Sequence, residues 1–137
     1  MKTASKTLVD TALREQWIRT VTDLKQQIKS WVAQEQGWTT EAGETDKIYE
    51  DALGDYTAPM LTIHSPEGEL RVEPIARNYP GLGIVELYAW PTLRRVRLLP
   101  DKTLGQWRIL TDSGIYLRQQ WDRESFMALA NDLIQAK

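Results

Sequence analysis

Arginine and aromatic residues recur at alternate positions in the second half of this chain, and they are the residues best suited to hold another molecule. Eight of them fall on one side of a two-residue alternation: Arg71, Tyr88, Trp90, Arg95, Arg97, Arg108, Tyr116 and Arg118. A guanidinium group binds carboxylate or phosphate through paired hydrogen bonds, and flat rings stack on bases or anchor protein interfaces. Counted with Arg77, Glu73 and Glu86, the set holds six arginines and two glutamates, so its expected charge is +4.

This pattern supports two binding functions. In the first, the chain is a non-catalytic interaction protein that presents its Arg/Tyr/Trp face to an acidic protein partner. In the second, Tyr88, Trp90 and Tyr116 stack on a single-stranded nucleic acid. An antiparallel sheet commonly has one solvated face, however, and arginine stems over aromatic rings make a stable exposed surface without any partner. The residues favour a solvated face over a partner, and a protein partner over nucleic acid.

A third function is a small carboxylate-based enzyme that uses Glu73, Glu86 and His64, the only histidine. Two glutamates on neighbouring strands could share acid and base roles, but arginine–glutamate pairing across strands is the more ordinary explanation. The chain has no cysteine, which excludes a disulfide framework, thiolate metal ligands and a cysteine nucleophile. We therefore predict no catalytic residue, no metal site and no cofactor, and an enzyme is the less favoured class.

Two glycine or acidic patterns resemble ligand motifs without matching them. Gly81 and Gly83 begin like a dinucleotide-binding loop, but Glu86 stands where the third glycine belongs and the segment leads into a strand. The acidic residues between positions 37 and 58 do not have the spacing of a calcium-binding loop. A turn and a solvated connector are the simpler interpretations.

The length of 137 residues predicts a single domain covering positions 1–137. The net charge of −2 does not indicate a general nucleic-acid or membrane-surface binder, although the charge is unevenly distributed. No apolar run approaches the roughly 20 residues that a membrane-spanning helix needs, and the first ten residues lack a secretory signal. We therefore predict a soluble, cytoplasmic protein without membrane contact.

A long helix is predicted over residues 8–36. Its apolar side chains recur at helical spacing, and Thr7 with Asp10 resembles a capping signal at its start. The seven-residue spacing of Trp17, Leu24 and Trp31 leaves open a homodimer through this stripe, but two heptads are fewer than a coiled coil needs. Docking of the stripe on the protein's own sheet is favoured.

After an acidic connector over residues 37–58, the apolar period changes to two. Residues 59–118 therefore predict a mostly antiparallel sheet of about six strands, because the connections are too short for crossover helices. The expected strands cover residues 60–64, 69–77, 84–90, 94–99, 106–111 and 115–118. The sequence Ser-Pro-Glu-Gly at 65–68 suits a type I turn that joins the first two as a hairpin. One alternating set is almost wholly apolar and forms the expected covered face: Leu61, Ile63, Leu70, Val72, Val85, Leu87, Ala89, Val96, Leu98, Trp107, Ile109, Ile115 and Leu117. Pro74 makes a bulge plausible in the second strand.

A C-terminal helix is predicted over residues 123–136. Asp122 is placed as its N-cap, and Trp121 with Phe126 occupies the positions of a hydrophobic staple. The predicted fold class is α+β, with both helices packed on one face of the sheet and the arginine and aromatic residues on the other.

Overall fold

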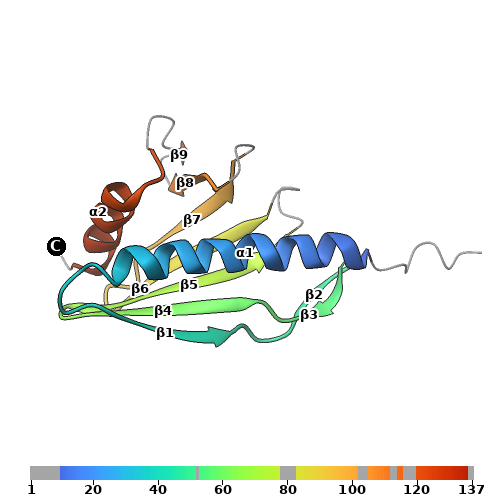
Figure 1. The fold of residues 1–137 in the computed structure, drawn as a ribbon, viewed down its shortest axis with the longest axis horizontal. Coiled ribbons are helices and arrows are strands. Elements are labelled where there is room, and N and C mark those ends of the chain that lie inside the picture. Colours follow the sequence, from blue (N-terminus) through green and yellow to red (C-terminus); the bar gives the residue numbers. More distant parts are fainter. Residues whose placement is uncertain are drawn as a thin grey trace, which may run out of the picture.

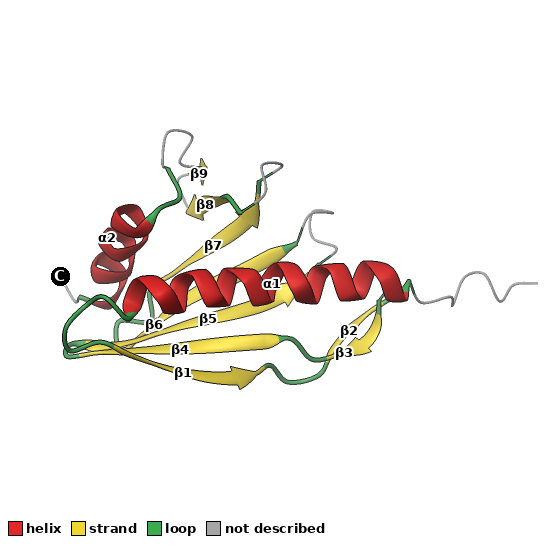
Figure 2. Ribbon diagram, viewed as in Figure 1, coloured by secondary structure: helices red, strands yellow, loops and turns green. Residues whose placement is uncertain are grey.

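Two helices cover one face of an antiparallel sheet, as Figures 1 and 2 show, and this confirms the predicted α+β class. The computed structural model describes residues 10–51, 53–77, 83–101, 105–111, 114–115 and 120–135. Within these residues the main sheet has seven strands in the order β1-β4-β5-β6-β7-β8-β9, and a separate hairpin joins β2 to β3. Successive strands pair with their neighbours, so the sheet is a meander with β1 added at one edge.

The strands predicted from two-residue alternation lie where the sequence placed them, within one or two residues wherever the structure describes them. They are β4 (Pro59–Ser65), β5 (Gly68–Ala76), β6 (Ile84–Trp90), β7 (Arg95–Pro100), β8 (Trp107–Thr111) and β9 (Gly114–Ile115). The Ser65 hydroxyl accepts hydrogen bonds from the backbone N–H groups of Glu67 and Gly68, which closes the predicted β4–β5 hairpin. The register of β5 against β6 shifts between Pro74 and Ala76, at the bulge that Pro74 suggested.

The acidic segment 37–58 is not the plain connector that the sequence predicted. It forms β1 (Thr39–Glu44), β2 (Ile48–Glu50) and β3 (Gly54–Tyr56). Strand β1 pairs with β4 along its whole length, and five of its six residues are exposed. An edge strand needs only the backbone of one neighbour, so its side chains stay in solvent and carry no apolar alternation. Charged residues such as Glu41 and Glu44 are typical of such an edge.

Helix α1 (Thr11–Val32) begins later and ends earlier than the predicted range 8–36. Asp10 is its N-cap and accepts a hydrogen bond from the backbone N–H of Leu13 at 2.9 Å, so the helix begins after Asp10. Residues 8 and 9 lie outside the described part of the chain. At the other end, turn hydrogen bonds replace the helical ladder from Gln34 onward, and Gly37 has a φ of +85°.

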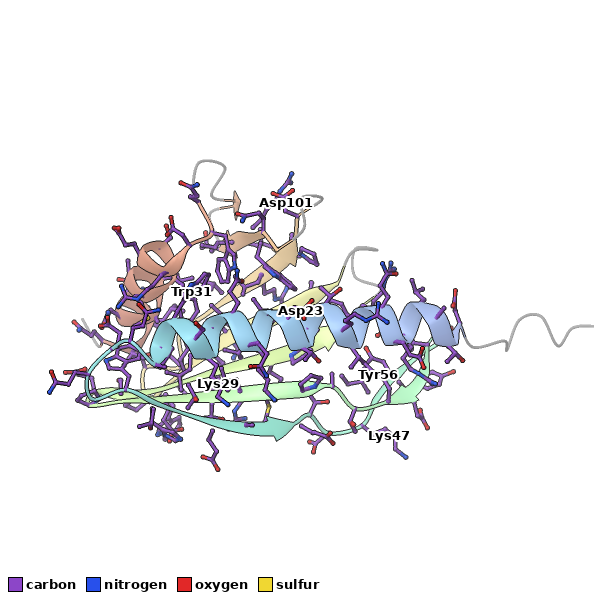
Figure 3. All side chains as sticks on the ribbon, viewed as in Figure 1. Asp23, Lys29, Trp31, Lys47, Tyr56 and Asp101 are labelled. Atoms are coloured by element: carbon purple, nitrogen blue, oxygen red, sulfur yellow. The ribbon has the colours of Figure 1, made fainter. Side chains whose placement is uncertain are left out.

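Helix α2 (Arg123–Ile134) begins as predicted and ends two residues before position 136. The Asp122 carboxylate accepts a hydrogen bond from the Ser125 N–H at 2.8 Å, which confirms the N-cap. The rings of Trp121 and Phe126 are 5.7 Å apart, which confirms the staple. Trp31, at the end of α1 nearest α2 (Figure 3), contacts both of these rings.

The core lies between the helices and the covered face of the sheet. The apolar stripe of α1 that includes Trp17, Val21, Leu24 and Ile28 is buried there, and α1 packs mainly on β4 while α2 packs on β5 and β6. Every member of the predicted apolar set from Leu61 to Ile109 is buried. The side chain of Ile115, and all of Leu117, lie outside the described part of the chain. None of the described helices is long and apolar enough to cross a membrane.

A polar contact attaches the β2–β3 hairpin to the rest of the protein. The Tyr56 hydroxyl donates a hydrogen bond to the Glu50 carboxylate, which also accepts the backbone N–H of Arg77 at 2.9 Å. Burial, followed by this hydrogen bond, raises the pKa of Tyr56 far above its usual value of 10. In Figure 3 Tyr56 is labelled at this end of the molecule, near the N-terminal end of α1.

Replacing Tyr56 with phenylalanine should lower the free energy of unfolding at pH 7 by about 1–2 kcal/mol, because the Glu50 carboxylate loses a donor in a partly buried place. The matched control is Tyr49→Phe, since Tyr49 also donates to a carboxylate, that of Asp51, but is 68% exposed. Its effect should stay below about 0.5 kcal/mol. Urea titrations monitored by tryptophan fluorescence compare the two, and equal losses would contradict the assignment.

The Tyr56 contribution should also depend on pH. A raised pKa in the folded state means that folding favours the protonated phenol. The stabilisation is therefore fully present below pH 10, the unfolded value, and is lost as the pH rises toward the folded value. Above pH 10, the stability difference between the wild-type protein and the Tyr56→Phe variant should shrink.

Candidate functional site

The face of the sheet opposite the helices carries the arginine and aromatic residues. In Figures 1 and 2 the helix α1 runs in front of the sheet, so this helix-free face points away from the viewer. The strand registers bring together Arg71, Tyr88, Trp90, Arg95, Arg97 and Arg108 on it. We call these residues, with the glutamates between them, the helix-free face. Six of the eight predicted binding residues therefore share one surface.

Cross-strand pairing places two arginines on either side of Tyr88. Arg71 on β5 and Arg95 on β7 are both register partners of Tyr88 on β6. The guanidinium carbon of Arg95 lies 5.0 Å from the centre of the Tyr88 ring, which is a cation–π contact. The ring is therefore partly covered, and Tyr88 has intermediate exposure. Arg95 holds Tyr88 in place instead of leaving it open as a stacking platform.

A glutamate holds the two arginines of β7. One carboxylate oxygen of Glu86, a side chain only 15% exposed, lies 3.6 Å from Arg95 Nη1 and 4.0 Å from Arg97 Nε. Arg108 is paired in a similar way, since its Nε lies 3.7 Å from Asp101 Oδ2 near the end of β7 (Figure 3). These arginines keep about half of their surface exposed, but each already has an acidic neighbour.

A shallow pocket opens between β5 and β6. It is lined by Glu69, Arg71, Tyr88 and Trp90 and has a volume of about 250 Å³. Trp90, the last residue of β6, is 57% exposed, and Glu69 is its register partner. Tryptophan, tyrosine and arginine are the residues that most often carry binding energy in protein interfaces. The pocket thus places three such side chains around one concave surface.

Among the described residues, this face carries as many glutamates as arginines, whereas the predicted +4 also counted Arg77 and Arg118. Its described charged residues are the arginines at 71, 95, 97 and 108 and the glutamates at 41, 69, 73 and 86. The charges balance in number: three of the four glutamates lie on β1 and β5, and three of the four arginines lie on β7 and β8. Glu69 belongs to the same alternation as Arg71 and could have been counted from the sequence. Glu41 could not be assigned to this face from the sequence, because the residues of β1 show no apolar alternation.

His64 occupies the acidic side of the face between two carboxylates. Its Nε2 lies 3.2 Å from Glu41 Oε1 and its Nδ1 lies 3.3 Å from Glu69 Oε2. Each ring nitrogen therefore has a carboxylate neighbour from an adjacent strand. This arrangement brings side chains of β1, β4 and β5 together on the helix-free face.

The three groups of the enzyme hypothesis do not come together. Glu73 and Glu86 are register partners, as the sequence suggested, but His64 is paired with Glu69. Glu73 is four positions beyond Glu69 on β5, so Glu73 and Glu86 lie about 13 Å along the strand direction from the pair of His64 and Glu69. Arg77, expected beside them, follows the β5 bulge and bonds to Glu50 through its backbone. The described residues hold no cluster of histidine and carboxylate side chains that could bind a metal.

Two of the eight predicted binding residues, Tyr116 and Arg118, lie outside the described residues. The stripe that left a homodimer open is used inside the chain: Trp17 and Leu24 are 3% and 1% exposed, and Trp31 packs on Phe126. Trp17 and Leu24 are therefore buried in the core and Trp31 is partly buried. A homodimer stays a prediction of the sequence.

Comparison with protein-family models, with curated proteins and with solved structures finds no match to this chain.

Proposed function

We propose that this protein is a non-catalytic interaction module whose helix-free face binds a protein partner at an acidic region. The observation that carries this proposal is the exposed Trp90 beside Arg71 and Tyr88 in one pocket. An indole left largely in water loses unfavourable hydration when a partner covers it, and a neighbouring arginine gives the contact direction and charge preference. Arg95 and Arg97 extend the cationic side of the same surface. A cytoplasmic location stays a prediction of the sequence.

Single-stranded nucleic acid is the alternative occupant of this face. Two features oppose it: Arg95 covers the Tyr88 ring, and the four glutamates would repel a phosphate backbone. Specific protein interfaces tolerate such mixed charges because a protein partner can match both signs. The helix-free face is therefore better suited to a protein than to a polyanion.

The test is affinity capture from a native lysate of the source organism, with the purified protein as bait and with or without nuclease. We compare the wild-type protein with Trp90→Ala and with Arg95→Gln/Arg97→Gln. The matched control is Arg19→Gln, because Arg19 is exposed on α1, on the other side of the molecule. A partner that depends on the face should be recovered about 10-fold less by Trp90→Ala, the loss expected of an interface hot spot.

Unchanged recovery with both face variants would contradict the proposal. Loss of the captured material on nuclease treatment would support the nucleic-acid alternative instead. Circular dichroism of each variant ensures that a lost partner reflects the surface and not the fold.

A further inference from the structure

The pocket between β5 and β6 contains a guanidinium group that the protein itself does not neutralise. Arg71 is exposed and forms no ion pair with any residue that the structure describes. The other described arginines of the helix-free face all have one: Arg95 and Arg97 with Glu86, and Arg108 with Asp101. Arg71 is therefore the cation of this face that is most available to an incoming anion.

The one acidic residue of the pocket, Glu69, lies beside His64 of β4. Glu69 Oε2 lies 3.3 Å from His64 Nδ1, on the side of β5 away from Trp90. Trp90 lies across the pocket on β6. A ligand that enters between Arg71 and Trp90 thus meets a free guanidinium on one side and an apolar ring on the other.

The turn that follows Trp90 adds a second exposed apolar side chain. Leu93 is 52% exposed and has a φ of +64°, a conformation that a leucine rarely adopts. Glycine or asparagine would adopt it with less strain. Trp90 and Leu93 thus present apolar surface at the same end of the sheet.

From these features we infer the chemistry of the partner, a step that rests on the proposed function. The pocket binds a linear peptide segment in which an aspartate or glutamate lies next to a large apolar residue. The carboxylate pairs with Arg71 and the apolar side chain packs on Trp90. Charge complementarity selects this occupant, because the pocket offers a cation without an ion pair beside two aromatic rings, and its one acid lies on the side toward His64.

The experiment uses a random 12-residue peptide library displayed on phage and selected on the full-length protein. Selected sequences should be enriched in an acidic residue adjacent to Leu, Ile, Phe, Tyr or Trp. A synthetic peptide of the consensus should then bind about 10-fold more weakly to Arg71→Gln and to Trp90→Ala, the usual loss for a charged hydrogen bond or an aromatic anchor. Arg19→Gln should bind it like the wild-type protein.

A second peptide, with the acidic residue changed to its amide, isolates the carboxylate. The wild-type protein should bind this amide peptide about 10-fold more weakly than it binds the acidic peptide. The Arg71→Gln variant should bind the two peptides with equal affinity. Enrichment of basic peptides, no enrichment over an unrelated bait, or full binding by Arg71→Gln would each overturn the inference. If one of these results is found but capture of the lysate partner still depends on Trp90, the proposed protein-binding function is retained. Only the inferred chemistry of the peptide is then wrong.

Discussion

Replacing Phe126 with alanine should lower the free energy of unfolding by about 3–5 kcal/mol, the largest loss that we expect from a side-chain truncation in this protein. Phe126 is fully buried, and its ring lies 5.8 Å from that of Trp31 and 5.7 Å from that of Trp121. The three rings join the end of α1 to the start of α2. Removing the central ring leaves a cavity that two large indoles cannot fill without leaving their own contacts.

Urea titrations monitored by tryptophan fluorescence measure this loss, and the near-ultraviolet circular dichroism of the two indoles should weaken with it. The control is Trp90→Ala, which removes a larger aromatic side chain from a place where it is 57% exposed. Its effect should stay below about 1 kcal/mol. A Phe126→Ala loss no greater than that of the control would show that the aromatic cluster does not hold the helices together.

The second large effect is expected at Gly83, immediately before β6. A Cβ atom at this position would lie 2.5 Å from Cζ3 and 2.7 Å from Cη2 of Trp17, and the φ of Gly83 is +107°. Alanine at this position must both displace a buried indole and adopt a backbone conformation that disfavours it. We expect Gly83→Ala to lower the free energy of unfolding by about 2–4 kcal/mol, measured in urea.

Gly105 provides the matched control for this substitution. It has a φ of +80°, but an added Cβ would meet no atom within 4 Å. Gly105→Ala therefore reports the backbone term alone, which is about 1–2 kcal/mol. If both substitutions cost the same, the contact between Gly83 and Trp17 is not tight, and the seating of α1 on this end of the sheet must be reconsidered.

The stability predictions and the binding predictions concern opposite sides of the sheet. The helices cover the apolar face, so changes at Phe126 or Gly83 act on folding. The side chains of Arg71 and Trp90 belong to the helix-free face, where truncation changes little in the core. Binding variants can therefore be interpreted without a large correction for lost stability.

Alternation of apolar residues was enough to predict β4 to β8 and the composition of both faces in those strands. Each of these strands has one buried face, so its side chains must alternate, and a shift of one residue would expose the core. The N-cap at Asp122 and the turn around Pro66 could also be predicted, because each depends on hydrogen bonds between residues at most three positions apart. The helix start was misplaced because Asp10, the true N-cap, resembled the acidic N3 residue of a capping box that begins at Thr7.

The candidate site could be predicted only in part. The alternation correctly placed Arg71, Tyr88, Trp90, Arg95, Arg97 and Arg108 on a single face. It did not show that Glu86 holds two of these arginines, or that Glu69 is directed toward His64. Such ion pairs depend on which strands are neighbours and in what register, and neither follows from the composition of one strand.

The sequence alone determined that this chain buries one side of a meander of strands beneath two helices, because hydrophobic periodicity and local caps depend only on residues close together in the chain. Only the tertiary structure decided that the acidic segment becomes an edge strand and that its Glu41 joins His64 on the face. It also decided that Arg71, unlike the other described arginines of the helix-free face, forms no ion pair there. The physical reason is that backbone pairing at an edge and ion pairing across strands join groups far apart in sequence, and neither leaves a periodic pattern in the chain.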